Sequence, residues 1–473
     1  MNRSIGKDEW VEQAADRQTG SRRSEYRRRV AAVPVQQRIL VVGAVALLFA
    51  LVSPTDYTTR VAFTVALYTL LATGLNVVVG WAGLLDLGYA AFFGFGAYAY
   101  ALLSSDKFHL HWPTLVSVPV VVAGAALLGF VLGLPSRRLS GDYLAIVTLF
   151  FGQIFVSIAN NGDRLQLKLG ATVVPDPAFN LTGGPNGVTG IDAMNLFGYH
   201  VRTITGYYLV AVVITMVVLS LLYRLRNARS GLALRTMRED PLAAEILSVP
   251  VRRLRLVAFA LGAGIAGLAG TMFAAVQQSV FGSNFDLPFL VLLYAAAILG
   301  GLGSLGGGLL GAVIVVVLPE MLRTPSTGRL LVYGALIIVV ALRLRPLRRL
   351  GEFVLALVAT GGLVRAGLAI FGANLRPRTS FGGVFVPHLA RSVSFGNVAF
   401  LAVIAGGLGL TTLPPRLRPL AGGVVAYIGM LAWENRLAEQ GSITRQLLVG
   451  AALVAIMASR PQGIFGTRRV EVL

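Results

Sequence analysis

The sequence predicts an all-α polytopic membrane protein made of two inverted five-helix repeats and about four extra C-terminal transmembrane helices. Of its 473 residues, 55% are hydrophobic and only 13% are charged, and the mean hydropathy is +0.73. Soluble globular proteins of this size rarely have such a composition. The hydrophobic residues lie in long runs with arginines clustered between them, which is typical of membrane spans joined by cytoplasmic loops.

Residues 1–38 form a polar N-terminal segment that ends in a run of arginines. The segment is too long and too charged for the n-region of a signal peptide, so we expect an uncleaved cytoplasmic tail. A disordered tail that sets the membrane orientation is the favoured interpretation. Contact with lipid headgroups or with a partner is the alternative.

Residues 39–350 contain two sets of five apolar spans and form the predicted core. The first set lies near 39–53, 61–79, 84–103, 114–134 and 143–160, and the second near 207–223, 256–276, 288–302, 305–322 and 329–342. A polar segment with glycines and prolines, residues 161–205, separates the two sets. Because five is odd, the second set starts on the opposite side of the membrane, as in inverted repeats that place a pathway at their interface.

Counting the crossings from a cytoplasmic N-terminus agrees with the positive-inside rule. The charged residues Arg137 and Arg138, the loop 224–255 and residues 343–349 are then cytoplasmic, whereas the loop 161–205 is external. We therefore expect a multi-pass protein of the bacterial cytoplasmic (inner) membrane with both termini in the cytoplasm.

Residues 351–473 add further spans near 353–371, 397–413, 420–433 and 446–459. The last of these, RQLLVGAALVAIM (445–457), faintly resembles RLLVYGALIIVV (329–340). Two interpretations stay open: a block inserted before the last helix of the core, or a module added after it.

The loop 224–255 is the most informative segment, because it is rich in arginine and lies between two apolar spans. Asp240 followed by Pro241 is a typical helix start, and Ala243, Ala244 and Glu245 continue it as good helix formers. A short, exposed, charged helix is predicted there.

This loop resembles the coupling loop of ABC importer permeases, whose EAA-type helix docks into a groove on the ATPase. Other segments resemble the M-type permease of branched-chain amino acid transporters, namely NVVVGWAGLLDLGYAAFFGFGAYAYALL (76–103), DYLAIVTL (142–149), LTGGPNGVTGI (181–191) and LGGLGSLGGGLLGA (299–312). Together they cover most of residues 60–345. The segment RPQGIFG (460–466) resembles the usual end of the family.

The resemblance implies a permease subunit that moves branched-chain or related amino acids into the cytoplasm. Urea, amides or other small polar solutes are the alternative substrates. ATP hydrolysis is expected on separate ATP-binding cassette ATPases, and this chain is expected to hold no catalytic residue and no cofactor. The implied partners are those ATPases, a second permease subunit in a heterodimer, an extracytoplasmic solute-binding protein facing LTGGPNG (181–187), and the lipid bilayer.

The residues expected to couple to the ATPase are Arg235, Arg238, Glu239, Asp240, Ala243, Ala244 and Glu245. Ala243 and Ala244 are small enough for a helix to enter a groove, and Glu245 can pair with a charge on the partner. Ser248 and Pro250 stand where the family pattern has a glycine and a polar residue.

Asn76, Asp86 and Tyr89 are candidates for a pathway or gate. An ionisable side chain near a membrane span is costly, so Asp86 is a functional candidate. Capping of a helix start is the equally weighted alternative for Asp86. The glycines of GFGAYAY and GGLGSLGGG favour close helix packing over a break in the helix. The second motif lacks the lysine of a phosphate-binding loop.

Several other functions are disfavoured by what the sequence contains. The chain has no cysteine, and its histidines His109, His111, His200 and His388 make no ligand spacing with carboxylates on one helix face, so no metal site is predicted. The basic residues that give the net charge of +20 are clustered between apolar spans, which argues against nucleic-acid binding. A proton-coupled transporter or a membrane-embedded transferase would need buried or paired carboxylates that the spans lack.

Overall fold

The computed structural model describes residues 34–52, 55–135, 141–169, 172–196, 198–323, 333–334, 347–370, 386, 392–433, 450–451, 454 and 463–465. Contacts between residues divide the chain into two units. Unit 1 comprises residues 1–314 and 460–473, and unit 2 comprises residues 315–459.

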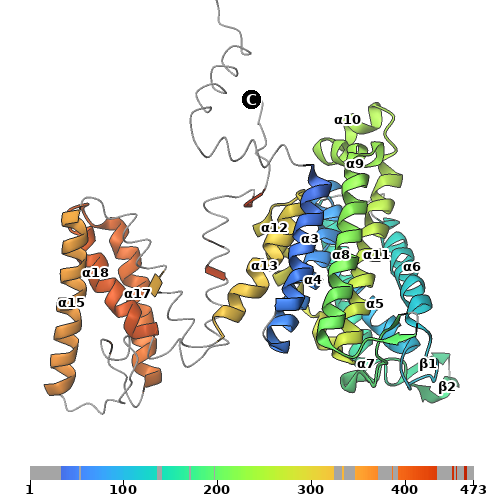
Figure 1. Cartoon of the computed structure of the whole chain (residues 1–473), viewed down its shortest axis with the longest axis horizontal. Helices are drawn as coiled ribbons and strands as arrows, with labels where there is room; N and C mark the ends of the chain where they lie inside the picture. Colours follow the sequence, from blue (N-terminus) through green and yellow to red (C-terminus); the bar gives the residue numbers. More distant parts are fainter. Residues whose placement is uncertain are drawn as a thin grey trace, which may run out of the picture. The chain divides into compact units, whose positions relative to one another are not determined.

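Unit 1 is a bundle of apolar helices (Figure 1). Its longer helices are α3 (Val35–Val52), α4 (Asp56–Leu75), α5 (Tyr89–Leu103), α6 (Thr114–Gly133), α7 (Asp142–Asn161), α8 (Ile204–Asn227), α11 (Val251–Gln277) and α12 (Leu287–Gly300). A π-helix, η1 (Asn76–Trp81), continues α4, and α13 (Leu305–Met321) runs from unit 1 into unit 2.

Among the described residues, seven helical stretches are long and apolar enough to cross a membrane, including Asp56–Trp81, in which α4 and η1 are continuous. α6 also keeps apolar side chains on its exposed face, such as Leu127, Phe130 and Val131, as a helix surrounded by lipid does. The all-α polytopic class is therefore confirmed. The predicted spans 329–342 and 446–459 lie almost entirely outside the described residues, and the inverted repeat stays a prediction.

α11 is the central helix of unit 1 and packs against α4, α5 and α6. The contact with α5 is backbone to backbone, since a Cβ atom added to Gly96 would lie 2.3 Å from the carbonyl oxygen of Gly267. α12 and α13 cross in the same way, with an added Cβ on Gly300 only 1.9 Å from Gly307 O. Close packing, the favoured interpretation of both glycine motifs, is confirmed.

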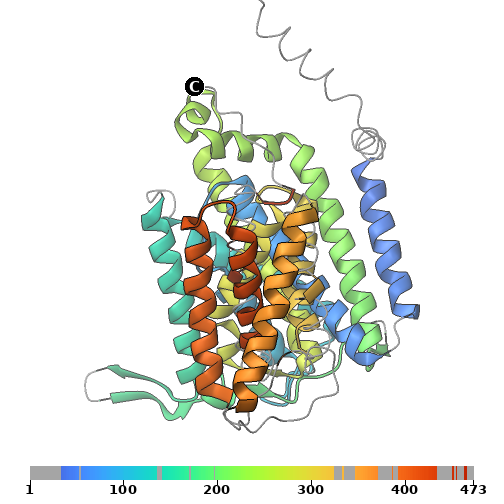
Figure 2. The same cartoon turned by 90° about the vertical axis from the view of Figure 1, so that its left-hand side faces the viewer.

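The two ends of unit 1 carry different structures (Figures 1 and 2). One end carries the short helices α9 (Arg229–Glu239) and α10 (Pro241–Ile246). The opposite end carries an antiparallel hairpin of β1 (Leu165–Leu169) and β2 (Thr172–Phe179).

Further short elements accompany the hairpin in the segment predicted as the loop 161–205. They are η3 (Gly184–Asn186), β3 (Val188–Thr189), β4 (Asn195–Leu196) and β5 (Tyr199–His200). β4 pairs with β5, and β3 pairs with β6 (Ser279–Val280) after α11, just before η4 (Gly282–Phe285). The segment is therefore a set of small paired strands rather than a featureless loop.

Unit 2 contains α15 (Leu347–Ile370), α17 (Ser392–Thr412) and α18 (Arg418–Ala432), and α18 packs against both of the others. The unit has a small core of its own around Tyr427, which is fully buried together with Leu431 and Ala399. These helices correspond to the predicted spans near 353–371, 397–413 and 420–433.

Residues Gly463–Phe465 return to unit 1 and cover the end of α12. Ile464 N donates to Leu299 O at 2.9 Å, and Phe465 N donates to Gly300 O at 3.0 Å. These acceptors are among the last carbonyls of α12, which have no partner within their own helix. The chain thus comes back to unit 1 after unit 2, and both interpretations of residues 351–473 stay open.

Candidate functional site

The loop between α8 and α11 folds into two short helices joined at Asp240. Its Oδ1 accepts hydrogen bonds from Leu242 N at 2.9 Å and from Ala243 N at 3.1 Å. Asp240 is therefore the N-cap of α10, and Pro241 occupies the first helical position, where a missing N–H costs nothing. The helix start predicted at this dipeptide is confirmed, and residues 229–247 are named the coupling segment below.

The outward face of α10 is apolar. Leu242, Ile246 and Leu247 are 74%, 84% and 71% exposed, and the charged Glu245 lies beside them in solvent. Exposed apolar residues gathered on a surface rimmed by charge are typical of a protein contact. Sequence reasoning missed these three residues because it concentrated on the alanines and the charges, although LAAEIL places apolar residues at both ends of the helix.

The structure separates the two alanines that were expected to enter a groove together. Ala243 is exposed, whereas Ala244 is fully buried in the core of this chain, in the same cluster as Trp81, Met237 and Val251. Ala244 is small because it packs against its own unit. A large residue at position 244 would therefore disturb this chain first, and only position 243 can report on a groove in a partner.

The predicted coupling arginines point into unit 1. Arg235 Nη2 donates to Arg226 O at 3.3 Å, which ties α9 to the end of α8. Arg238 Nη1 donates to the carbonyl oxygen of Gly80 in η1. The acidic residue Glu239 is exposed. Of the predicted charged residues, Glu239 and Glu245 are thus exposed, and Arg238 joins the coupling segment to the end of a spanning helix.

Asn76 joins the same π-helix to the turn between α12 and α13. Its Nδ2 donates to Ser304 O at 2.9 Å, and its Oδ1 accepts from Gly303 N at 2.5 Å. Trp81 Nε1 donates to Gly303 O at 3.3 Å. The π-helix η1, the turn 301–304 and Arg238 are named the inner junction below. It connects elements more than 150 residues apart in the sequence.

The inner junction depends on a close backbone approach at Gly80. A Cβ atom there would lie 1.9 Å from Asn76 Oδ1 and 2.6 Å from Gly303 N. Any larger residue would displace the amide of Asn76 from the turn. A π-helix is a costly irregularity that proteins keep mainly at functional sites, so its position at this contact supports a functional role.

Asp86 and Tyr89 lie in and after the loop that follows the π-helix, and both are fully buried. Asp86 Oδ1 accepts from Gly88 N at 2.9 Å, and Tyr294 Oη donates to the backbone oxygen of Asp86 at 2.6 Å. Oδ2 of Asp86 has no hydrogen-bond partner among the described residues. Tyr89 Oη donates to Gly262 O at 3.2 Å.

These contacts bear on the two roles predicted for Asp86, which are capping of a helix start and a part in a pathway or gate. Asp86 accepts from the N–H of Gly88, the residue before α5, and not from a free N–H group of the first turn, so it does not cap this helix. The second carboxylate oxygen of a capping aspartate is normally hydrogen-bonded or solvated, whereas burying such an oxygen without a hydrogen bond costs free energy. A role of Asp86 or Tyr89 in a pathway stays a prediction. The structure places Asn76 with Arg238 in the inner junction, and Asp86 and Tyr89 outside it.

The described residues thus form a multi-pass bundle of apolar helices of the kind found in integral membrane proteins, with the exposed apolar helix α10 at one end. The family model described as "Branched-chain amino acid transport system / permease component" matches residues 57–341. The chain belongs to this family.

Two relatives agree with this assignment. The chain is 35% identical over 305 residues to the high-affinity branched-chain amino acid transport system permease protein LivM of Escherichia coli K12, covering 59% of this chain and 67% of the relative. LivM of Salmonella typhimurium is 36% identical over 296 residues, covering 58% of this chain and 65% of the relative.

A more distant relative is the probable permease protein LivH of Methanocaldococcus jannaschii, 27% identical over 233 residues, which are 47% of this chain and 68% of that protein. The comparison with solved structures found no match.

Proposed function

We propose that this chain is the M-type permease subunit of an ABC importer that moves branched-chain amino acids into the cytoplasm. The names of the relatives support the substrate class, and they favour it over urea, amides and other small polar solutes. The proposed partners are ATP-binding cassette ATPases, a second permease subunit and an extracytoplasmic solute-binding protein. ATP hydrolysis takes place on the ATPases.

The exposed face of α10 is the observation that carries the proposal. Leu242, Ile246 and Leu247 are not covered by any described residue of unit 1, while Ala244 and Met237 anchor the helix from beneath. A helix anchored on one side and apolar on the other transmits a push from its partner to its own core. In the proposed orientation this end of unit 1 is cytoplasmic, where ATPases are found.

The inner junction provides the next step of the proposed mechanism. Movement of α9 shifts Arg238, which is bonded to Gly80 in the π-helix. The π-helix in turn holds the turn 301–304 through Asn76 and Trp81. Closure of the ATPases would then change the packing of α4 against α12 and α13, and alternating access requires a change of this kind.

The proposal predicts that the apolar face of α10 is needed for coupling. The test is reconstitution of the purified permease with its ATPases and second permease subunit in proteoliposomes. Leu242→Glu and Ile246→Glu place a charge in the proposed contact, and Glu245→Arg reverses the charge at its edge. We expect amino acid uptake to fall at least tenfold in the first two variants, with the ATPases no longer co-purifying.

Tyr199→Glu is the matched control, because Tyr199 is 70% exposed and lies on β5 at the opposite end of unit 1. It should bind the ATPases normally. Thermal unfolding of each isolated permease shows whether the fold is intact. Normal uptake by both Leu242→Glu and Ile246→Glu would show that α10 is not the coupling element.

A further inference from the structure

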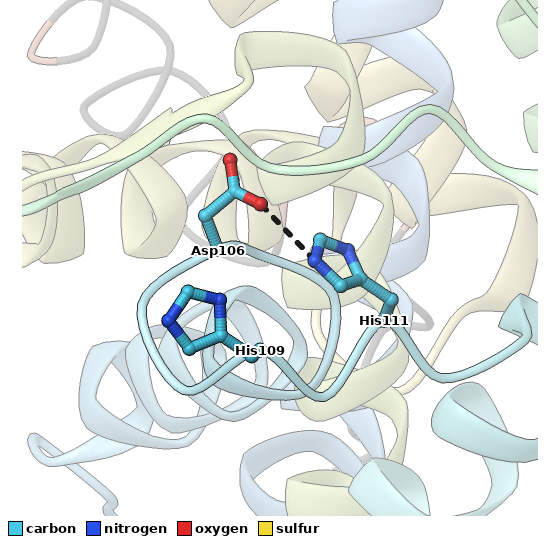
Figure 3. Close-up of side chains that lie close together, drawn as sticks. All are labelled: Asp106, His109 and His111. Carbon is cyan, nitrogen blue, oxygen red and sulfur yellow. Dashed lines mark ion pairs between the residues drawn. The ribbon is translucent and has the colours of Figure 1, made fainter.

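The loop between α5 and α6 gathers two imidazoles and a carboxylate. Asp106, His109 and His111 each offer one ligand atom, and these atoms lie within 4.8 Å of one another. Figure 3 shows Asp106 facing His111, whose Nε2 lies 3.1 Å from Asp106 Oδ1, with His109 on the same turn of the loop. No second group of this kind is found in the described part of the chain.

The loop that carries these residues is fixed at both ends. Ser105 forms an isolated β-bridge with Ile191, and Asp192 N donates to Ser104 O at 2.7 Å. At the other end Trp112 N donates to Leu103 O at 2.9 Å. A ligand set on a held loop loses less conformational entropy on binding than one on a free loop, because its geometry is already formed.

A second carboxylate approaches His111 from a different segment. Asp192 Oδ2 lies 2.7 Å from His111 Nδ1. A metal-ligating histidine usually donates its other ring N–H to such a carboxylate, which fixes the tautomer and the ring orientation. With Nδ1–H directed to Asp192, the lone pair of Nε2 is directed to the side of Asp106. The hydrogen bond to Asp192 and the charges of both carboxylates raise the pKa of His111.

We propose that Asp106, His109 and His111 form a binding site for a divalent late transition-metal ion of the Zn²⁺ class, with Asp192 positioning His111. Two imidazoles and one carboxylate are a common protein ligand set for Zn²⁺, and water completes the tetrahedron. Mg²⁺ and Ca²⁺ prefer oxygen ligands only and are poorly matched to two imidazoles. The ion ties the end of α5 to the start of α6 and, through Asp192, to the segment before β4.

Sequence reasoning predicted no metal site because it looked for ligands spaced along one helix face. The ligands instead lie on a tight loop in which His109 and His111 adopt φ angles of 54° and 40°. This left-handed backbone brings the three side chains together. In a helix or a strand, the spacing D-x-x-H-x-H would not place all three on one face. The proposal concerns the end of unit 1 opposite the coupling segment, and it does not depend on the transport function proposed above.

Direct titration tests the site. The full-length chain, purified without a histidine tag in detergent, is titrated with Zn²⁺ by calorimetry and separately with Mg²⁺. We expect one saturable Zn²⁺ per chain and no saturable Mg²⁺. His109→Ala should lower the Zn²⁺ affinity at least tenfold, and Asp192→Asn should lower it about 10–100-fold, as for other carboxylates that orient a metal-ligating histidine. Co²⁺ in place of Zn²⁺ should give the visible absorption of a tetrahedral site.

His200→Ala is the matched control, because His200 is an exposed histidine on β5 outside the cluster. It should bind Zn²⁺ as the unmodified chain does. The thermal unfolding of the metal-free His109→Ala and His200→Ala variants should coincide with that of the unmodified chain, since both side chains are exposed. The proposal is overturned if the chain binds no Zn²⁺ at a one-to-one ratio, or if His109→Ala and His200→Ala bind it equally well.

Discussion

Asn76→Ala should open the inner junction. The substitution removes the hydrogen bond from Asn76 Nδ2 to Ser304 O and the one from Gly303 N to Asn76 Oδ1. A typical intramolecular hydrogen bond contributes about 1 kcal/mol of net stability, so both together contribute about 2 kcal/mol. A loss of about 2 kcal/mol shifts the equilibrium between the closed and the open junction roughly 30-fold toward the open state.

A single cysteine can report this shift, because the chain contains none. Leu302→Cys places a thiol in the turn 301–304, next to the groups that Asn76 holds. The measurement is the rate of thiol labelling by a water-soluble maleimide in the purified permease. If labelling requires opening of the junction, Asn76→Ala should accelerate it by up to about 30-fold. Asn76→Asp keeps the acceptor for Gly303 N and should have an intermediate effect.

The control for this experiment removes a buried hydrogen bond elsewhere in unit 1. Thr271→Val deletes the bond from Thr271 Oγ1 to Leu268 O within α11, which is 2.7 Å long. It should leave the labelling rate at position 302 unchanged. An equal labelling rate in Asn76→Ala and in the unmodified background, with the fold intact by thermal unfolding, would refute the role of Asn76 in closing the junction.

Three further predictions concern the coupling segment and the orientation. Ser248 follows α10 with φ 61°, a left-handed conformation that costs a non-glycine residue roughly 1 kcal/mol, so Ser248→Gly should raise the thermal unfolding temperature. Asp240→Ala should destabilise α10 by about 1 kcal/mol and increase proteolysis of residues 229–247, whereas Asp240→Asn should not. Single cysteines replacing Arg348 and Pro185 should be labelled by an impermeant reagent from the cytoplasmic and the external side, respectively. External labelling of position 348 would contradict the proposed orientation.

Much of the fold could be predicted because membrane spans are defined by local composition. A run of apolar residues that crosses a bilayer must satisfy its backbone within a helix, so hydropathy alone located α3 to α8 and α11 to α13. The boundaries were less predictable. The π-helix after α4 begins at Asn76, which contacts a turn more than 200 residues away, and no local pattern shows it.

The sequence predicted the position of the candidate site, but it did not predict which residues of α10 are buried and which are exposed. Asp240 and Pro241 determine a helix start through their own chemistry, which the sequence contains completely. Which alanine of α10 faces inward depends on the angle at which α9 packs on Trp81, and that angle is a tertiary property. The histidine cluster was missed for a related reason, since a left-handed loop has no recognisable period.

The two sides of the contact between the end of α12 and residues 463–465 are synthesised at different times. The carbonyls of Leu299 and Gly300 receive Ile464 N and Phe465 N, which the ribosome adds roughly 160 residues later. At about 5–20 residues per second, roughly 10–30 s of synthesis separate the two halves of this contact. All of unit 2 is made in that interval. A nascent chain that stops before residue 464 therefore lacks both N–H groups that these carbonyls accept from, and the last carbonyls of α12 stay without these partners.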